Sequence, residues 1–149
     1  LAIEILEHNY DQKVIYLMGV NNNGYRFAKL IQKEMQLWGK VEVHLINVRL
    51  NAAHPLKDEI TISVDSKTLS GQNVVVVDDV ANSGRTLYFA TKPLLNILPR
   101  KIEAAVLVDR LHKLFPIKVD YVGMSLATTL KQNIQVDLDD GRAFSVLLD

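Results

Sequence analysis

The sequence predicts an α/β fold with a doubly wound, mostly parallel sheet and flanking helices, and three observations support this prediction. Short apolar runs at residues 14–18, 74–77 and 104–108 alternate with longer segments whose apolar residues follow helical spacing. The run at residues 74–77 is four consecutive valines, which is typical of a strand buried on both faces. The 149 residues, of which 48% are apolar, contain no repeat or linker, so a single domain over residues 1–149 is expected.

The first half of the chain predicts two helices, two strands and a loop. Residues 1–6 have the apolar spacing of an amphipathic helix, and the first strand is followed by Gly19. Residues 24–37 place most of their apolar side chains on one helical face. Residues 41–48 alternate apolar and polar side chains, as a strand with one covered face does. The pattern dissolves over residues 50–68, where we expect a mobile loop.

The second half of the chain predicts further strands and helices and a C-terminal hairpin. A helix is expected over residues 84–98, and Pro93 should bend or end it. A short strand at residues 119–122 follows the apolar run that precedes Asp109. Residues 134–138 and 144–148 are expected to pair as a hairpin around an Asp-Gly turn.

The composition excludes several classes of function. The absence of cysteine excludes disulfides, thiol nucleophiles and cysteine-based zinc sites, and it favours the cytoplasm. Seventeen Lys plus Arg balance seventeen Asp plus Glu, so no overall basic field indicates nucleic acid or an anionic membrane surface. No apolar run approaches the roughly 20 residues of a membrane helix, so no membrane association is expected. The histidines lack metal-ligand spacing: His8, His44, His54 and His112.

Polar clusters follow three of the predicted strands. They occupy residues 19–24, residues 78–86, and residues 109–110 with residues 121–123 close by in the same sheet. Ligands of open parallel sheets bind outside the carboxyl ends of the strands. Because those ends share one edge of the sheet, we expect the three clusters to form one site.

The cluster at residues 78–86 is the most informative. A loop of small residues between a buried strand and a helix can point successive backbone N–H groups at a phosphate, and Ser83 and Thr86 add hydroxyls. Asp78 and Asp79 can accept hydrogen bonds from sugar hydroxyls or hold the water shell of a cation. The cluster therefore predicts a phosphorylated sugar as ligand. The Walker and dinucleotide glycine patterns are missing, which excludes those two sites.

Each cluster also has a purely structural interpretation. A carboxylate after a buried strand can cap the next helix, and an Asn-rich turn is common in α/β connections. Arg49 and Lys57 are ordinary solvated charges unless the loop closes over the site. Arg110 alone is compatible with a surface ion pair. The agreement of three clusters at one edge favours a site over these alternatives.

The segment VVVVDDVANSGRT (residues 74–86) resembles the phosphoribosyl-pyrophosphate (PRPP) motif of type I phosphoribosyltransferases. Residues 104–123 and 16–31 resemble the branch that contains the bifunctional pyrimidine-operon regulator and uracil phosphoribosyltransferase. The resemblance implies that family's fold, with a small hood near the C-terminus. It also implies transfer of the phosphoribosyl group of PRPP to a nucleobase, with uracil as the first candidate, with Mg²⁺ as cofactor and in a homodimer.

The resemblance implies a role for each cluster. The catalytic candidates are Asp78, Asp79 and Arg49, and the two aspartates would also support Mg²⁺ indirectly, through PRPP or water. The matches to the loop around the 5′-phosphate are Ala81, Asn82, Ser83, Gly84, Arg85 and Thr86. The matches to the pyrophosphate loop are Gly19, Val20, Asn21, Asn22, Asn23 and Gly24. The matches to the base-binding region are Asp109, Arg110, Tyr121, Val122 and Gly123. Residues 50–68 take the place of a flexible loop that closes over the reaction.

The chain departs from the family pattern at three places. Basic side chains are usual in the pyrophosphate loop, whereas residues 21–23 are three asparagines, which donate hydrogen bonds without charge. Leu50 and Asn51 replace an acidic pair, and Met124 replaces a lysine. These departures leave a second hypothesis open: a weakly active or inactive regulator of the same fold that senses nucleotide and binds RNA. A third hypothesis is an enzyme for a purine base.

Overall fold

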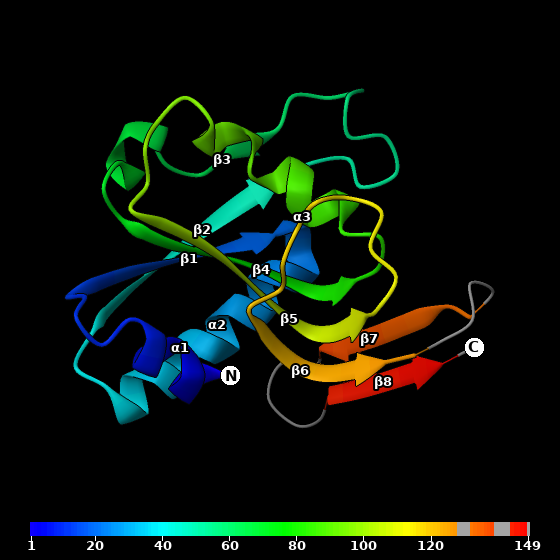
Figure 1. Ribbon diagram of the computed structural model, residues 1–149, viewed down its shortest axis with the longest axis horizontal. Coiled ribbons are helices and arrows are strands. Elements are labelled where there is room, and N and C mark those ends of the chain that lie inside the picture. Colours follow the sequence, from blue (N-terminus) through cyan, green and yellow to red (C-terminus); the bar gives the residue numbers. More distant parts are fainter. Residues whose placement is uncertain (128–131, 139–143, 149) are drawn as a thin grey trace.

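The computed structural model describes residues 1–127, 132–138 and 144–148, and its central element is a six-stranded sheet (Figure 1). The strands are β1 (Val14–Val20), β2 (Glu42–Arg49), β3 (Thr61–Ile62), β4 (Asn73–Ala81), β5 (Lys101–Arg110), β6 (Tyr121–Leu126), β7 (Ile134–Leu138) and β8 (Phe144–Leu148). The helices are α1 (Ala2–His8), α2 (Asn21–Trp38) and α3 (Arg85–Ala90), with 3₁₀ turns η1 (Ser66–Leu69) and η2 (Lys92–Leu94).

The sheet has the order β3-β2-β1-β4-β5-β6, and only the short edge strand β3 runs antiparallel to its neighbour. This arrangement confirms the expected doubly wound, mostly parallel sheet. From β1 the chain proceeds to β2 on one side, and β4 then pairs with β1 on the other side. The strand order therefore reverses between β1 and β4, and a crevice at such a point is the usual ligand site of this architecture.

Both faces of the sheet are covered by helices. Val75 and Val77 pack in one core cluster with residues of α1 and α2, whereas Val74 and Val76 pack in a second cluster with residues of α3 and η2. In Figure 1, α1 and α2 lie below the sheet and α3 lies above it. The run of four valines is therefore buried on both faces, as the sequence predicted, because alternate side chains of a strand point to opposite faces.

The C-terminal hairpin forms a separate two-stranded sheet. β7 and β8 pair antiparallel from Ile134↔Leu148 to Leu138↔Phe144, which confirms the predicted hairpin, and its turn at Asp140-Gly141 lies outside the described residues. Val136 and Leu138 are buried in the cluster that α2 forms with the main sheet. This small sheet occupies the place of the hood expected near the C-terminus.

Several element boundaries differ from the sequence predictions, and β4 itself continues to Ala81, four residues beyond the run of valines. The helix expected over residues 84–98 ends at Ala90, because the Thr91 hydroxyl caps the Tyr88 carbonyl at 2.6 Å and Pro93 lacks an N–H. Helix α2 starts at Asn21, three residues before its expected start. Strand β6 ends at Leu126, four residues later than expected, because its pairing with β5 continues to Arg110.

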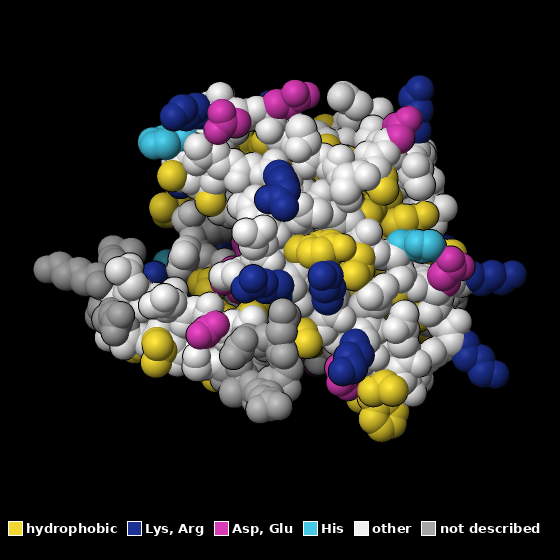
Figure 2. Space-filling model, turned by 180° about the vertical axis from the view of Figure 1, so that it is seen from behind, with side chains coloured by type: hydrophobic (Ala, Val, Ile, Leu, Met, Phe, Trp, Pro, Cys, Tyr) yellow, Lys and Arg dark blue, Asp and Glu magenta, His cyan; other side chains and the backbone are white. Residues whose placement is uncertain are grey.

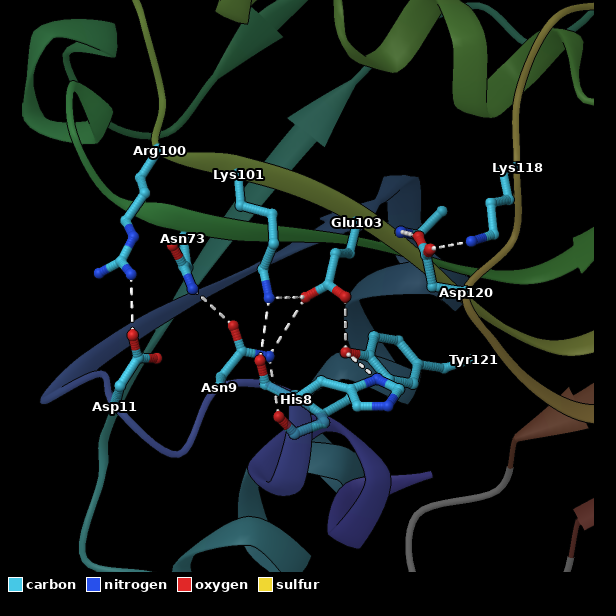
Figure 3. A network of polar contacts seen from close by, with 12 residues as sticks. His8, Asn9, Asp11, Asn73, Arg100, Lys101, Glu103, Lys118, Asp120 and Tyr121 are labelled. Carbon is cyan, nitrogen blue, oxygen red and sulfur yellow. Dashed lines mark hydrogen bonds and ion pairs between the residues drawn. The ribbon is translucent and has the colours of Figure 1, made fainter.

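A buried polar network lies where the parallel strands begin, at the edge away from the predicted site (Figure 3). The Tyr121 hydroxyl donates to Glu103 at 2.7 Å, and Asn9 donates to the same carboxylate at 3.2 Å. Lys101 forms an ion pair with Glu103 at 3.1 Å. Burial opposes ionisation of Glu103, but the hydrogen bonds from Tyr121, Lys101 and Asn9 outweigh it and lower the pKa of Glu103 below its ordinary value. The network joins α1 to β5 and β6.

The surface seen from behind carries charges of both signs (Figure 2). On this face, Lys and Arg side chains are scattered among acidic, apolar and uncharged ones rather than gathered in one basic field. Within the parts of the chain that the structure describes, no helix is long and apolar enough to cross a membrane.

Candidate functional site

The reversal of strand order brings the first two polar clusters together. β1 ends at Val20 and α2 begins at Asn21, beside the carboxyl end of β4 with its acidic pair. Asn23 donates from Nδ2 to Oδ2 of Asp79 at 3.0 Å. Gly24 allows this approach, because a Cβ at Gly24 would lie 2.5 Å from the Val77 carbonyl oxygen. The sequence pattern alone did not indicate this close packing of α2 against β4.

The segment expected as a loop at residues 19–24 is a strand end followed by the first turn of α2. Asn21 makes the corner with a φ of 51°, which asparagine tolerates better than most residues. Its side-chain amide pairs with the backbone of Leu50, donating at 3.0 Å and accepting at 3.1 Å. The side chains of Asn21 and Asn23 thus form hydrogen bonds to other parts of the protein. Asn22 is exposed, and its side chain makes no hydrogen bond to the residues the structure describes.

The two carboxylates at the end of β4 lie in different environments. Asp78 is only 7% exposed, and burial, reinforced by the charge of Asp79, raises its pKa well above the ordinary value. Its Oδ1 accepts a hydrogen bond from the Asp79 N–H at 2.9 Å. Asp79 is half-buried, and its other hydrogen bond comes from the Val80 N–H at 2.9 Å. Asp79 therefore presents an oriented carboxylate to the crevice, and Asp78 lies beside it, more deeply buried.

The loop after β4 lines a cavity of about 350 Å³. Gly84 adopts a φ of 84°, and a Cβ there would lie 2.4 Å from Ile117. The Ser83 carbonyl accepts hydrogen bonds from the N–H groups of Leu114 and Phe115, at 2.9 and 3.2 Å. The predicted phosphate-loop residues all line this cavity: Ala81, Asn82, Ser83, Gly84, Arg85 and Thr86. The segment after β5 thus braces the loop from behind.

Arg85 connects this loop to the segment after β2. Its guanidinium donates to the carbonyl oxygens of Ala52 at 2.8 Å and Ala53 at 3.4 Å. Ala52 and Ala53 form a wall of the cavity that this loop lines. The Arg85 side chain therefore holds the neighbouring segment, and Arg85 lines the cavity together with the other residues of the loop.

A second cavity, of about 500 Å³, adjoins the first. Ala52, Val80, Asn82 and Thr86 line both cavities, so the two cavities form one groove. The second cavity is further lined by the acidic pair, the end of β1, the corner of α2 and the hairpin: Val20, Asn21, Asn22, Asn23, Asp78, Asp79 and Ile134. Ile134 was not expected in the site, and only the tertiary fold reveals it.

The third cluster reaches the groove in part. Arg110 donates from Nη1 to Oδ1 of Asn82 at 3.2 Å and also contacts the Gln132 carbonyl. Asp109 forms an ion pair with Lys113, four residues along the chain, a spacing that the sequence shows. Arg110 therefore adjoins the loop of residues 81–86 at Asn82.

Tyr121, Val122 and Gly123 do not reach this edge. Tyr121 begins β6 opposite Ala105, and its side chain is fully buried against Glu103 and His8 (Figure 3). The residues of β6 level with Asp109 and Arg110 are Ser125 and Leu126. This placement corrects the expectation drawn from the shorter predicted strand.

Arg49 also lies apart from the groove. It is exposed at the end of β2 and pairs through its backbone with Thr61. Its side chain makes no hydrogen bond or ion pair with the described residues, and it is not among those that line the two cavities. The structure in this conformation does not bring Arg49 to Asp78 and Asp79.

The carboxylates of the groove suit a cation that is shared with a bound ligand. Within residues 1–127, 132–138 and 144–148, no three His, Cys, Asp or Glu side chains gather into a metal site. Asp78 and Asp79 supply two carboxylates, and Mg²⁺ in proteins is commonly held by one or two carboxylates plus substrate phosphates. The residues present therefore fit a magnesium ion that a phosphorylated substrate shares.

Comparisons with known proteins agree with this geometry. The family model of the phosphoribosyl transferase domain matches residues 1–140. Bifunctional protein PyrR of Streptococcus sanguinis is 30% identical over 145 residues, which cover 94% of this chain and 83% of that protein. Bifunctional protein PyrR of Caldicellulosiruptor saccharolyticus is 32% identical over 150 residues, which cover 94% of this chain and 81% of that protein.

Solved structures show the same fold. The hypoxanthine phosphoribosyltransferase of Trypanosoma cruzi matches with a TM-score of 0.74 at 17% identity, over 98% of this chain and 86% of that one. A hypoxanthine-guanine phosphoribosyltransferase from Bacillus anthracis matches with a TM-score of 0.66 at 21% identity, over 84% and 72%. Together with the family match, these likenesses confirm the resemblance found in the sequence. The chain belongs to the phosphoribosyltransferase family, with the type I fold, and is close to the bifunctional protein PyrR.

Proposed function

We propose that this protein transfers the phosphoribosyl group of PRPP to a nucleobase, with release of pyrophosphate. The main support is the continuous groove that joins the loop of residues 81–86 to the acidic pair and the corner of α2. In this proposal the 5′-phosphate lies in the loop cavity, where backbone N–H groups and the hydroxyls of Ser83 and Thr86 surround it. The ribose hydroxyls then face Asp79, and the pyrophosphate faces Asn22.

The acidic pair suits the chemistry of this transfer. The bond between the anomeric carbon and pyrophosphate breaks while a bond to a ring nitrogen of the base forms, and positive charge develops on the ribose. The carboxylate of Asp79, oriented by Asn23 and the Val80 N–H, stabilises such charge without reorganisation. The buried Asp78 supports the orientation of Asp79 through the Asp79 N–H. Positioning and electrostatics therefore account for the role of these residues.

Mg²⁺ is the cofactor we propose. Asp78 and Asp79 would hold it jointly with PRPP oxygens or through water, since the described residues offer only these two carboxylates in the groove. When bound, Mg²⁺ supplies charge neutralisation for the pyrophosphate leaving group.

The base is proposed to bind beside Asp109 and Arg110, where Arg110 adjoins Asn82. Uracil is the first candidate, because the sequence resemblance is strongest to the pyrimidine-operon branch. A purine base is the alternative, since the solved structures of similar fold are named for hypoxanthine and guanine. The hydrogen-bonding edges of these bases differ, so a substrate panel distinguishes them.

A regulator that binds nucleotide with little or no catalysis is the second candidate function. One observation favours it: the corner of α2 has no charged side chain, and Asn21 and Asn23 already bond to Leu50 and Asp79. Such a corner attracts pyrophosphate weakly compared with lysine or arginine. A site of this kind is expected to bind a nucleoside monophosphate more tightly than PRPP. RNA binding in this second proposal would show as a salt-dependent mobility shift of a labelled RNA.

The deciding experiment measures nucleotide formation from PRPP and Mg²⁺ with uracil, hypoxanthine, guanine, xanthine and adenine. Asp79→Asn should abolish turnover while leaving the fold intact. Asp11→Asn, an exposed aspartate paired with Arg100 far from the groove, is the matched control and should turn over normally. Turnover of one base, lost only in Asp79→Asn, supports the enzyme, and absence of turnover with every base contradicts it.

We also propose that the protein is a cytoplasmic homodimer. Ile3, Leu37 and Trp38 on α1 and α2 are each more than half exposed, which suits an apolar contact between copies. Analytical ultracentrifugation at micromolar concentration tests this proposal, and a monomer that persists at high concentration contradicts it.

A further inference from the structure

The corner between β1 and α2 has a backbone conformation that L-residues rarely adopt. Asn21 has a φ of 51°, and among the described residues it is the one non-glycine residue with a positive φ. Conformations of this kind persist where surrounding contacts determine them, and they gather at ligand sites. The contacts that hold Asn21 therefore show which residues shape this corner of the groove.

Two side-chain amides hold Asn21 in place. Asn47 of β2 donates from Nδ2 to the carbonyl oxygens of Gly19 at 3.1 Å and Asn21 at 2.9 Å. The Asn21 amide donates to the Leu50 carbonyl at 3.0 Å and accepts from the Leu50 N–H at 3.1 Å. Asn21, Asn47 and the Leu50 backbone together are called the amide clamp below. Leu50 is only 8% exposed and packs in the core with Val20, so the clamp is anchored in the core just after the end of β2.

The amide clamp controls two parts of the groove. Asn21 and Ala52 are among the described residues that line the groove. Asn47 and Leu50 are not among them. Asn23 follows two residues after Asn21 and donates to Asp79. Ala52 follows two residues after Leu50 and lines both cavities. A shift of the clamp therefore moves the contact to Asp79 at one end and a wall of the phosphate cavity at the other.

We propose that Asn47 is a positioning residue of the phosphoribosyl site. It acts through Asn21, setting the corner of α2 against Asp79 and fixing the start of the segment that contains Ala52. Asparagine suits this position because its Nδ2 has two hydrogens, one for the Gly19 carbonyl oxygen and one for the Asn21 carbonyl oxygen. Aspartate has the same shape without those hydrogens, and leucine has a similar size without polar atoms. The inference rests on the proposed function for the identity of the ligand only.

Ligand binding gives the first test. Calorimetry with PRPP and with ribose 5-phosphate, both with Mg²⁺, compares the wild type with Asn47→Asp, Asn47→Leu and Ile46→Val. PRPP affinity should fall about tenfold in both Asn47 variants, a loss typical of one or two hydrogen bonds. Ribose 5-phosphate affinity should fall by a smaller factor, because this ligand lacks the pyrophosphate that faces Asn22, next to Asn21. Ile46→Val, the neighbour on β2, removes a buried methyl group without touching the clamp, so its PRPP affinity should stay within about twofold. Unchanged PRPP affinity in both Asn47 variants, or equal loss of both ligands, overturns the proposal.

A double variant tests whether Asn47 acts through Asn21. If the two residues act as a unit, Asn21→Ala/Asn47→Leu loses no more than about twofold beyond the weaker-binding single variant. Additive losses would mean that Asn47 affects PRPP independently of Asn21, and they would overturn the proposed route.

Amide hydrogen exchange without ligand separates this inference from the proposed function. A wild type that binds neither PRPP nor ribose 5-phosphate would contradict the proposed function and leave the clamp to be judged by exchange alone. The clamp predicts that the Leu50 amide, whose N–H donates to Oδ1 of Asn21, exchanges about tenfold faster in Asn47→Leu than in Ile46→Val. Equal exchange at this amide in the two variants overturns the inference.

Discussion

Replacing Gly24 by alanine should disable the groove while largely sparing the fold. The added Cβ would lie 2.5 Å from the Val77 carbonyl oxygen and 3.3 Å from the Asp78 Cα. Ordinary contact begins near 3.4 Å, so the start of α2 must retreat from β4 by about 0.9 Å. That movement pulls Asn23 away from Asp79, a bond now 3.0 Å long. A misplacement of about 1 Å in a positioned site costs up to about a hundredfold, so we expect PRPP affinity or turnover to fall between about tenfold and a hundredfold.

The stability cost should be much smaller than the functional loss. Overpacking costs about 1–3 kcal/mol, and the better helix propensity of alanine returns about 1 kcal/mol, so the net loss is about 0–2 kcal/mol. The matched control is Gly39→Ala at the other end of α2, where φ is −140° and the new Cβ meets only the flexible Leu6 side chain closely, at 2.9 Å. Calorimetric PRPP binding and thermal unfolding are measured on both variants. Wild-type PRPP affinity in Gly24→Ala, with a Tm equal to that of Gly39→Ala, would refute the reasoning.

Three further predictions concern ionisation and the segment after β2. Asp78→Asn should raise the Tm at pH 7, because the pKa of Asp78 is raised in the folded state, which therefore loses stability as pH rises above the ordinary value of 3.8. The gain in Tm should vanish below that pH, and a Tm below that of the wild type at pH 7 would contradict this reasoning. Glu103→Gln should lower the free energy of unfolding in urea by about 1.5–3 kcal/mol at neutral pH. Because the pKa of Glu103 is lowered in the folded state, this loss relative to the wild type should shrink as pH falls below 4.5. A loss that does not change with pH would contradict the stabilising role of the ionised Glu103. Arg85→Ala should speed amide exchange at His54, whose N–H donates to Oδ1 of Asn51, because the Arg85 guanidinium holds the carbonyl oxygens of the intervening Ala52 and Ala53. Exchange equal to wild type would show that this contact does not restrain the segment.

Much of the architecture follows from patterns that are local in the sequence. The valine run forms the doubly buried strand β4, and the hairpin of β7 and β8 has the predicted ends. These elements depend on side-chain alternation over a few residues, which the chain shows directly. The helix after Gly84 is shorter than its apolar spacing suggested, because the Thr91 cap and Pro93 stop it. Periodicity indicates which face a helix would bury, and capping decides how long the helix is.

The site depends on contacts between residues far apart in the chain. Asn21 and Leu50 are 29 positions apart, and Asn23 and Asp79 are 56 positions apart, so neither pair is visible as a motif. Asn47 leaves only a weak signal, since it is a polar residue on the covered face that Val43 and Leu45 share. Tyr121 lies outside the expected site because the register of β6 on β5 depends on pairing along the whole strand.

The sequence by itself determined the order of the main strands and helices and the small-residue loop with its acidic pair, and β3 and most of η1 lie in the segment expected as a loop. The main elements and the loop depend on residues that are neighbours in the chain, so apolar spacing and short motifs show them, whereas the family followed from the resemblance of residues 16–31, 74–86 and 104–123. The tertiary structure decided which side chains of those motifs remain available to a ligand. Asn21 and Arg85 bond to the segment after β2, and Asp78 lines the groove beside Asp79 but is largely buried, because the reversal of strand order packs four separate segments around one crevice.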